Sequence, residues 1–283
     1  MKNQLIADAG STKIDWTYTG PGGTLRRFQT EGLNALLATA DQMTRLFGAV
    51  REALSDIPID RIHYYGAGCA SPAICDKVRD ILQEALGATD VSVGSDLLGA
   101  ARALLGHRPG VACILGTGSN SCLYDGRDIT MNSPPMGFIL GDEGSGAVLG
   151  KRLAGDVSKS IAPEHIRTRF KTRFGLTVTD LLDHVYRQSA PNRFLASLVP
   201  FISENINDPY MHGLVSDEFS RFFNRNVLRY PGARDIPVNF TGSIAVVFED
   251  ILKEAAGRAQ LSVGTIMGAP MPGLITYHTD HTD

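Results

Sequence analysis

Residues 4–20 read QLIADAGSTKIDWTYTG, and this stretch decides the fold. An apolar run ends at Asp8, small residues follow at 9–12, and apolar residues then alternate through Ile14, Trp16 and Tyr18. Alternation with a period of two is typical of a strand, and a Gly-Ser-Thr segment between two strands is typical of a tight turn. The stretch therefore predicts a β-hairpin whose turn carries polar groups.

The same pattern begins again near the middle of the chain. Residues 111–115 read VACIL, the segment GTGSN follows at 116–120, and apolar residues return at Cys122 and Tyr124. Two strand–turn–strand openings predict two similar α/β lobes, and 283 residues are enough for two domains. The predicted limits are residues 1–106 for the N-terminal lobe, 107–269 for the C-terminal lobe, and a tail at about 270–283 that packs back on the first lobe.

The segments between and after the hairpins alternate between helix and strand patterns. Apolar steps of three and four predict one amphipathic helix from Leu33 to Leu54. Ser71-Pro72 and Ser95-Asp96 are typical helix starts, each followed by a helix that ends at glycine. The remaining expected elements are strands at 61–66, 91–93, 236–241 and 261–267, a mostly helical region at about 151–230, and a helix from Gly242-Ser243 to Ala256.

Composition excludes several classes of partner. The formal charge of −3, from 27 basic and 30 acidic residues, gives no positive field for nucleic acid or an anionic membrane. No stretch approaches the ~18 apolar residues of a membrane span. The four cysteines lack the CxxC spacing of zinc and redox sites, which predicts buried thiols in a cytoplasmic protein.

The two small-residue turns are candidates for nucleotide binding. Consecutive backbone N–H groups in such a turn form a concave site for phosphate. In the first turn Asp8 is placed to hold Mg²⁺ through water, and GTGSN in the second lobe has the same character. A purely structural hairpin would look similar, because such turns are common. The residues assigned to ATP from these turns are Gly10, Ser11, Thr12, Lys13, Gly116, Thr117 and Gly118.

Six segments carry a resemblance to a known family. They are DAGSTKIDW, EGLN, SDLLGAARAL, ILGTGSNS, MGFILGDEGSG and FTGSIA, in matching order over roughly residues 5–270. Together they resemble the N-acetylglucosamine kinase branch of the BadF/BadG-type ATPase family. The resemblance implies a duplicated ribonuclease H-like (actin-like ATPase) fold with an interlobe cleft, in which ATP and Mg²⁺ bind. It also implies a small-molecule sugar as substrate, and it allows a homodimer.

The resemblance assigns roles to individual residues. Asp96 takes the place of the general base that receives the proton of the sugar hydroxyl, although an aspartate there also suits a helix cap. Gly242 and Ser243 match the turn that binds adenosine, although a simple strand-to-helix turn would look the same. The sugar is assigned to Asn34, Asp96, Gly118, Ser119, Asn120, Gly137, Phe138 and Asp142, with Glu143 capping the following helix.

The sequence leaves the sugar and the activity partly open. Phe138 stands where the vertebrate members have tryptophan, so glucosamine or another sugar remains an alternative to N-acetylglucosamine. An ATPase that activates a radical dehydratase or reductase shares the fold, but needs thiolates arranged for an iron–sulfur cluster. A sugar-sensing relative without catalysis is the third alternative, against which the retention of Asp8, Asp96 and Asp142 argues.

Overall fold

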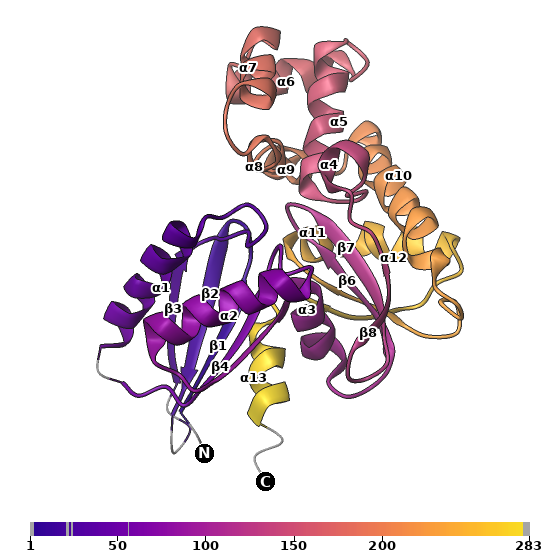
Figure 1. Ribbon diagram of the computed structural model, residues 1–283. Coiled ribbons are helices and arrows are strands. Elements are labelled where there is room, and N and C mark those ends of the chain that lie inside the picture. Colours follow the sequence, from indigo (N-terminus) through magenta and orange to yellow (C-terminus); the bar gives the residue numbers. More distant parts are fainter. Residues whose placement is uncertain (1–2, 21–22, 24, 56, 280–283) are drawn as a thin grey trace. The chain divides into compact units, whose positions relative to one another are not determined.

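Two compact units make up the protein. The computed structural model describes residues 3–20, 23, 25–55 and 57–279. One unit comprises the chain up to Gly106 together with the segment from Pro270 onward, and the other spans His107–Ala269. Each unit contains a five-stranded mixed sheet with helices packed on it, so the predicted α/β fold with two lobes is confirmed (Figure 1).

The sheet of the first unit has the strand order β3-β2-β1-β4-β5. β1 and β2 form the antiparallel hairpin predicted from residues 4–20, whereas β4 pairs in parallel with both β1 and β5. The elements of this unit are β1 (Gln4–Ala9), β2 (Lys13–Thr19), β3 (Leu25–Glu31), α1 (Ala40–Leu54), β4 (Arg61–Gly66), α2 (Pro72–Leu86), β5 (Asp90–Ser95), α3 (Asp96–Leu105) and α13 (Met271–Thr279).

The side chains of β1 divide the first unit into two apolar layers. Leu5 and Ala7 belong to the cluster that α1 and α2 cover, while Ile6 faces the opposite side of the sheet. There Ile6 and Tyr65 pack with Met271 and Leu274 of α13, which lies beside α3 (Figure 1). The segment expected as a tail is therefore a helix that covers one face of the sheet; its last predicted part, 280–283, lies outside the described residues.

The first helix begins later than its apolar spacing predicts. α1 starts at Ala40, because Thr39 and Gln42 form a capping box in which each side chain accepts a hydrogen bond from the other's backbone N–H. Leu36 and Leu37, which were expected on the apolar face, are 64% and 78% exposed. The spacing at 33–37 came from a loop that happens to continue the period of the helix.

The second unit has the strand order β10-β9-β6-β7-β8 around a second core. The helix expected up to Ala256 is divided at Phe248 into α11 and α12. The elements are β6 (Gly110–Leu115), β7 (Ser119–Tyr124), β8 (Ile129–Ser133), α4 (Gly137–Leu140), α5 (Gly146–Ser158), α6 (Glu164–Phe174), α7 (Val178–Tyr186), α8 (Pro191–Ala196), α9 (Val199–Glu204), α10 (Pro209–Arg225), η2 (Val227–Arg229), β9 (Val238–Thr241), α11 (Ser243–Val247), α12 (Glu249–Arg258) and β10 (Val263–Met267).

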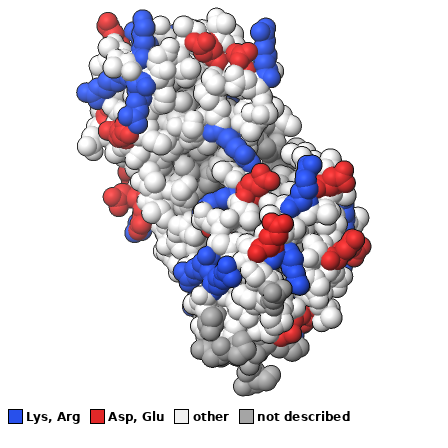
Figure 2. Space-filling model, turned by 90° about the vertical axis from the view of Figure 1, so that its left-hand side faces the viewer, with Lys and Arg blue, Asp and Glu red and all other residues white. Residues whose placement is uncertain are grey.

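Surface charge is mixed in sign. Basic and acidic side chains alternate on the face drawn in Figure 2, in keeping with a formal charge of −3. Within the part of the chain that the structure describes, no helix is both long and apolar enough to cross a bilayer.

The packing of α13 predicts the effect of truncating a single side chain. Leu274 is fully buried against the sheet, so Leu274→Ala should lower the free energy of unfolding by about 2–5 kcal/mol, as buried Leu→Ala changes do. Thr276→Ala, on the exposed side of the same helix, is the control and should change it by less than ~0.5 kcal/mol. Denaturant unfolding of both variants checks this; equal stability of the two would contradict the packing role of α13.

Candidate active site

Asp96, the predicted general base, and Asp8, the predicted metal-binding residue, lie at one edge of the first sheet. In register, Ala9 lies opposite Gly66 and Gly66 opposite Ser95, so the parallel strands β1, β4 and β5 end together. Asp8 is the last residue but one of β1, and Asp96 follows β5 directly. We call Asp8, residues 10–13, Asn34 and Asp96 the polar edge.

The two carboxylates of the polar edge influence each other. Burial, and next the negative charges of Asp15 and Asp96, raise the pKa of Asp8 to about 7, while Lys13 opposes the shift. Burial also raises the pKa of Asp96. Hydrogen bonds from backbone N–H groups stabilise its charged form and oppose this shift. The polar edge thus concentrates negative charge in a poorly solvated place, which is a favourable site for a cation.

The structure separates Asp96 from the role of helix cap. The N-cap of α3 is Ser95, whose hydroxyl accepts the backbone N–H of Leu98 at 3.1 Å. Asp96 is the first helical residue, and its carboxylate accepts the N–H of Leu97 at 2.8 Å. That bond fixes the direction of the carboxylate without making it the cap.

The first turn is held by the loop that precedes α1. The N–H of Leu33 donates to the carbonyl of Gly10 at 3.1 Å, and the N–H of Gly32 to that of Thr12 at 3.0 Å. A Cβ on Gly32 would lie 2.3 Å from the backbone of Thr12, so only glycine permits this approach. Lys13 is exposed and pairs with Asp15 at 2.9 Å, along β2.

Asn34 belongs to the same edge but is engaged locally. Its Oδ1 accepts the N–H of Leu36 at 3.1 Å, which is an Asx turn, and the N-cap of α1 is Thr39. The loop after β4 packs against it, since a Cβ on Gly68 would lie 2.2 Å from Asn34 Oδ1. Gly32 and Gly68 were missed by sequence reasoning; the sequence signal was glycine one or two residues after a strand, at Glu31-Gly32 and Gly66-Ala67-Gly68.

In the second unit, the turn after β6 is joined to the start of α5. The N–H groups of Gly146 and Ala147 donate to the carbonyls of Gly116 and Thr117, at 2.8 and 3.1 Å. Ser145 is the N-cap of α5, so the prediction that Glu143 caps this helix is wrong. The carbonyl groups of Gly116 and Thr117 therefore already have hydrogen-bond partners within the protein.

Asp142 lies directly against this turn. Its carboxylate accepts the backbone N–H groups of Ser119 and Gly137, and a Cβ on Gly118 would lie 2.9 Å from its Oδ2. Burial raises the pKa of Asp142 to about 6, and the charge of Glu143 adds to this shift, whereas the two hydrogen bonds oppose it. We call Gly118, Ser119, Gly137 and Asp142 the Asp142 cluster; four predicted sugar-site residues thus come together.

The other predicted sugar-site residues of this unit have internal partners. The hydroxyl of Ser119 donates to the carbonyl of Glu143 at 2.9 Å. Asn120 Oδ1 accepts from the N–H of Ser121 and from Asn132 Nδ2, both at 2.9 Å. Phe138 is half-buried against the core of the unit. These groups hold the local structure together, whatever else they contact.

Gly242 and Ser243 meet the end of β6. The φ of Gly242 is 117°, and a Cβ there would lie 2.2 Å from the carbonyl oxygen of Leu115. Close strand packing by itself therefore requires glycine at this position. Ser243 is the exposed first residue of α11. The two glycine turns of the second unit are neighbours, because Leu115 directly precedes Gly116.

The four thiols do not provide ligands for a cluster. Cys69, Cys113 and Cys122 are buried and Cys75 half-buried, all as free cysteines. Burial raises the pKa of Cys69 and of Cys122 to about 12, so both are protonated at neutral pH. In the described residues no group of three or more His, Cys, Asp or Glu is arranged to hold a metal ion.

Two such α/β units, each opening with a polar hairpin turn, define the class of actin-like phosphotransferases. A candidate N-acetylglucosamine kinase from Porphyromonas gingivalis is 42% identical, with both chains covered in full and a TM-score of 0.95. The chain therefore belongs to the family of ATP-dependent sugar kinases that this protein represents.

More distant structures share the fold. A candidate N-acetylglucosamine kinase from Chromobacterium violaceum is 18% identical, covering 98% of this chain and 99% of its own, with a TM-score of 0.70. A ROK family glucokinase from Streptomyces griseus, in complex with glucose and AMPPNP, is 14% identical over 97% of both chains, with a TM-score of 0.59. No protein-family model and no curated protein sequence matches the chain.

The glycine turn of the second unit offers a test that leaves folding intact. A Cβ on Gly116 meets no protein atom within 4 Å, so Gly116→Ala should fold normally. If phosphate oxygens approach this backbone, the added methyl group should weaken ATP binding by about 10-fold or more, because a site of close backbone approach needs glycine. Gly155→Ala, equally uncrowded but within α5, is the control. Isothermal titration with ATP decides, and unchanged affinity of Gly116→Ala would remove this turn from the nucleotide site.

Proposed function

We propose that the protein transfers the γ-phosphate of ATP to a hydroxyl of N-acetylglucosamine or a related amino sugar, as a member of the BadF/BadG-type branch. The observation that carries this proposal is the convergence of Asp8 and Asp96 at the polar edge, where burial and the charges of Asp15 and Asp96 raise the pKa of Asp8. The 42% identity to a candidate N-acetylglucosamine kinase supports the choice of sugar.

Asp96 has the properties of a general base. It is half-buried directly after β5, and desolvation raises the pKa of its carboxyl toward the range in which it accepts a proton well. The bond from Leu97 holds the carboxylate in one direction, and phosphoryl transfer depends mainly on such positioning. We propose that Asp96 accepts the proton of the attacking sugar hydroxyl.

Asp8 fits a divalent cation. Its carboxylate lies among the like charges of Asp15 and Asp96, which a cation would offset. Mg²⁺ commonly uses one or two carboxylates and keeps water or phosphate oxygens as its other ligands. Asp8 would hold the ion through water, and the bound ion would supply neutralisation of the phosphate charge.

The sugar contacts are proposed for Asn34, Asp142 and the backbone around Gly118 and Gly137. A carboxylate and an amide are suited to accept from and donate to neighbouring hydroxyls. The bonds already made by Ser119 and Asn120 indicate that these two shape the site, while Phe138 presents an apolar face. ATP is proposed for the turns at 10–13 and 116–118 and for Gly242-Ser243.

A coupled assay of ADP release separates the alternatives. With Mg²⁺ and ATP, the proposal expects ADP only when a sugar is added, fastest among N-acetylglucosamine, glucosamine and their relatives. An activating ATPase would instead release ADP without sugar and would carry iron. A sugar sensor would bind the sugar in a titration calorimeter and release no ADP.

Catalysis should depend on Asp96 much more than sugar binding does. Asp96→Asn removes the base and keeps Ser95 as the cap of α3, so kcat should fall by about 10²–10⁴-fold with little change in KM or melting temperature. Asp90→Asn is the control. Asp90 lies at the exposed start of β5, the strand that leads to Asp96, so this change removes only a surface partner of Arg61 and should leave kcat unchanged. Near-normal kcat in Asp96→Asn, at normal stability, would refute the assignment.

A further inference from the structure

Asp142 has a backbone conformation that is uncommon for residues other than glycine, although aspartate adopts it more readily than most. Its φ is 55°, in the left-handed region that suits glycine. A non-glycine residue keeps such a conformation only where surrounding contacts hold it, and such residues gather at functional sites. The carboxylate of Asp142 can keep its hydrogen bond to the N–H of Ser119 only while this turn is held.

Besides the bond from the N–H of Ser145 to the carbonyl of Asp142 at 3.0 Å, the turn is held by contacts of the next residue, Glu143. Its side chain is buried, and its backbone carbonyl accepts the hydroxyl of Ser119 at 2.9 Å. Its carboxylate forms an ion pair with Nε of Arg225 and accepts Nδ2 of Asn226 at 3.3 Å. Arg225 is the last residue of α10, and Asn226 is also tied to this helix through the carbonyl of Phe222 at 3.2 Å.

We propose that Arg225 is a positioning residue for the sugar site: it anchors Glu143 to the end of α10 and so fixes the turn that carries Asp142. The inference rests on the proposed role of Asp142 in sugar binding. Arg225 itself lies on a helix more than 80 residues further along the chain and is joined to the turn by its ion pair with Glu143. Loss of Arg225 leaves a buried carboxylate without its cation, which favours a rearrangement of the turn.

The same anchor affects the charge of Asp142. The groups that act on its carboxylate are the backbone N–H groups of Ser119 and Gly137, the charge of Glu143, and Lys151 of α5. Burial and the charge of Glu143 raise its pKa to about 6, so sugar binding by the carboxylate should be lost as pH falls through about 6. Glu143→Gln removes the like charge, which lowers this pKa and shifts the acidic limb of kcat/KM for the sugar to lower pH.

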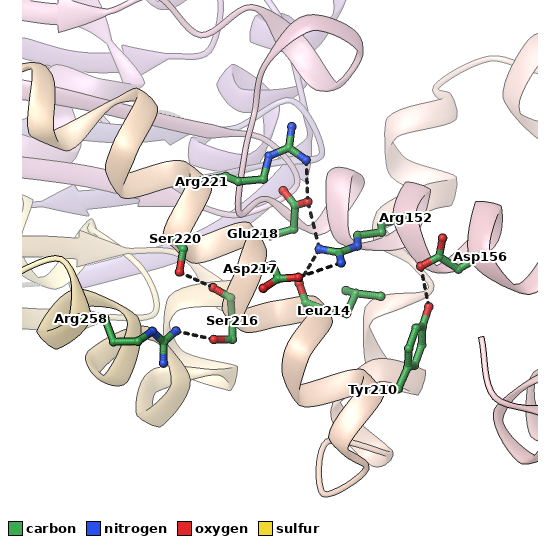
Figure 3. Close-up of polar contacts among 10 residues, drawn as sticks. All are labelled: Arg152, Asp156, Tyr210, Leu214, Ser216, Asp217, Glu218, Ser220, Arg221 and Arg258. Carbon is green, nitrogen blue, oxygen red and sulfur yellow. Dashed lines mark hydrogen bonds and ion pairs between the residues drawn. The ribbon is translucent and has the colours of Figure 1, made fainter. Parts of the chain in front are cut away.

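Arg221 provides a matched control on the same helix. It lies one turn before Arg225, is exposed, and pairs with the buried Glu218 at 3.2 Å. Figure 3 shows Arg221 and Arg152 converging on Glu218, from α10 and α5. Both Arg221 and Arg225 line a pocket of about 300 Å³. Of these two arginines, Arg225 is the one that pairs with Glu143, next to Asp142, whereas Arg221 pairs with Glu218.

The kinetic test compares Arg225→Met with Arg221→Met. Arg225→Met should raise KM for the sugar by about 10-fold or more with a smaller change in kcat, because misplacement of a binding group by ~1 Å costs up to ~10²-fold. Arg225→Lys, which keeps the cation, should restore part of the loss, and Arg221→Met should leave KM unchanged. An unchanged KM in Arg225→Met, or an equal rise in both methionine variants, would overturn the inference.

A spectroscopic test without sugar separates this inference from the proposed function. The amide signal of Ser119 should follow the ionisation of Asp142 through their hydrogen bond, with an apparent pKa near 6 that Asp142→Asn abolishes. Glu143→Gln should move this titration to lower pH, and Arg225→Met should greatly reduce its amplitude. A normal titration in Arg225→Met refutes the positioning role, whereas failure of the wild type to phosphorylate any sugar refutes only the proposed function.

Discussion

Parallel pairing of β1 with β4 and of β4 with β5 is the constraint on which the polar edge depends. It makes three strands from separate parts of the chain end at one level, so that Asp8 and Asp96 share an environment although they are 88 positions apart in the sequence. Strand register is strict here, because a slip by one residue turns every side chain to the opposite face of the sheet. Apolar layers on both faces of β1 enforce that register.

In the second unit, candidate site residues are positioned by backbone segments that approach one another closely. Carbonyls of the turn at 116–117 bind the first amides of α5, and Gly242 packs against Leu115 at a distance that no other residue tolerates. Asp142 then lies in the space that the missing side chain of Gly118 leaves. Glycine in this unit therefore serves both the packing of strands and the placement of a carboxylate.

Much of this fold could be read from local signals. The hairpins, the caps Ser71 and Ser95, and the division into two α/β lobes follow from residues close in sequence. The start of α1 and the helix α13 could not be predicted, because a loop continued the helical period at Leu33–Leu37 and tertiary burial stabilises a Pro- and Gly-containing segment at 271–279. The Glu143–Arg225 contact joins distant segments and has no local signature. The roles given to individual site residues remain predictions.

The route of the chain through its two units has a consequence for biosynthesis. His107–Ala269 is a continuous segment, whereas the first unit needs α13, which is translated after all of it. In a nascent chain the Ile6–Tyr65 face of the first sheet therefore lacks the part of its apolar cover that α13 supplies until residues 271–279 have been made. The core of the continuous unit contains no residue of α13, so it needs nothing that is translated after Ala269, whereas the earlier-made sheet is completed only by the last helix.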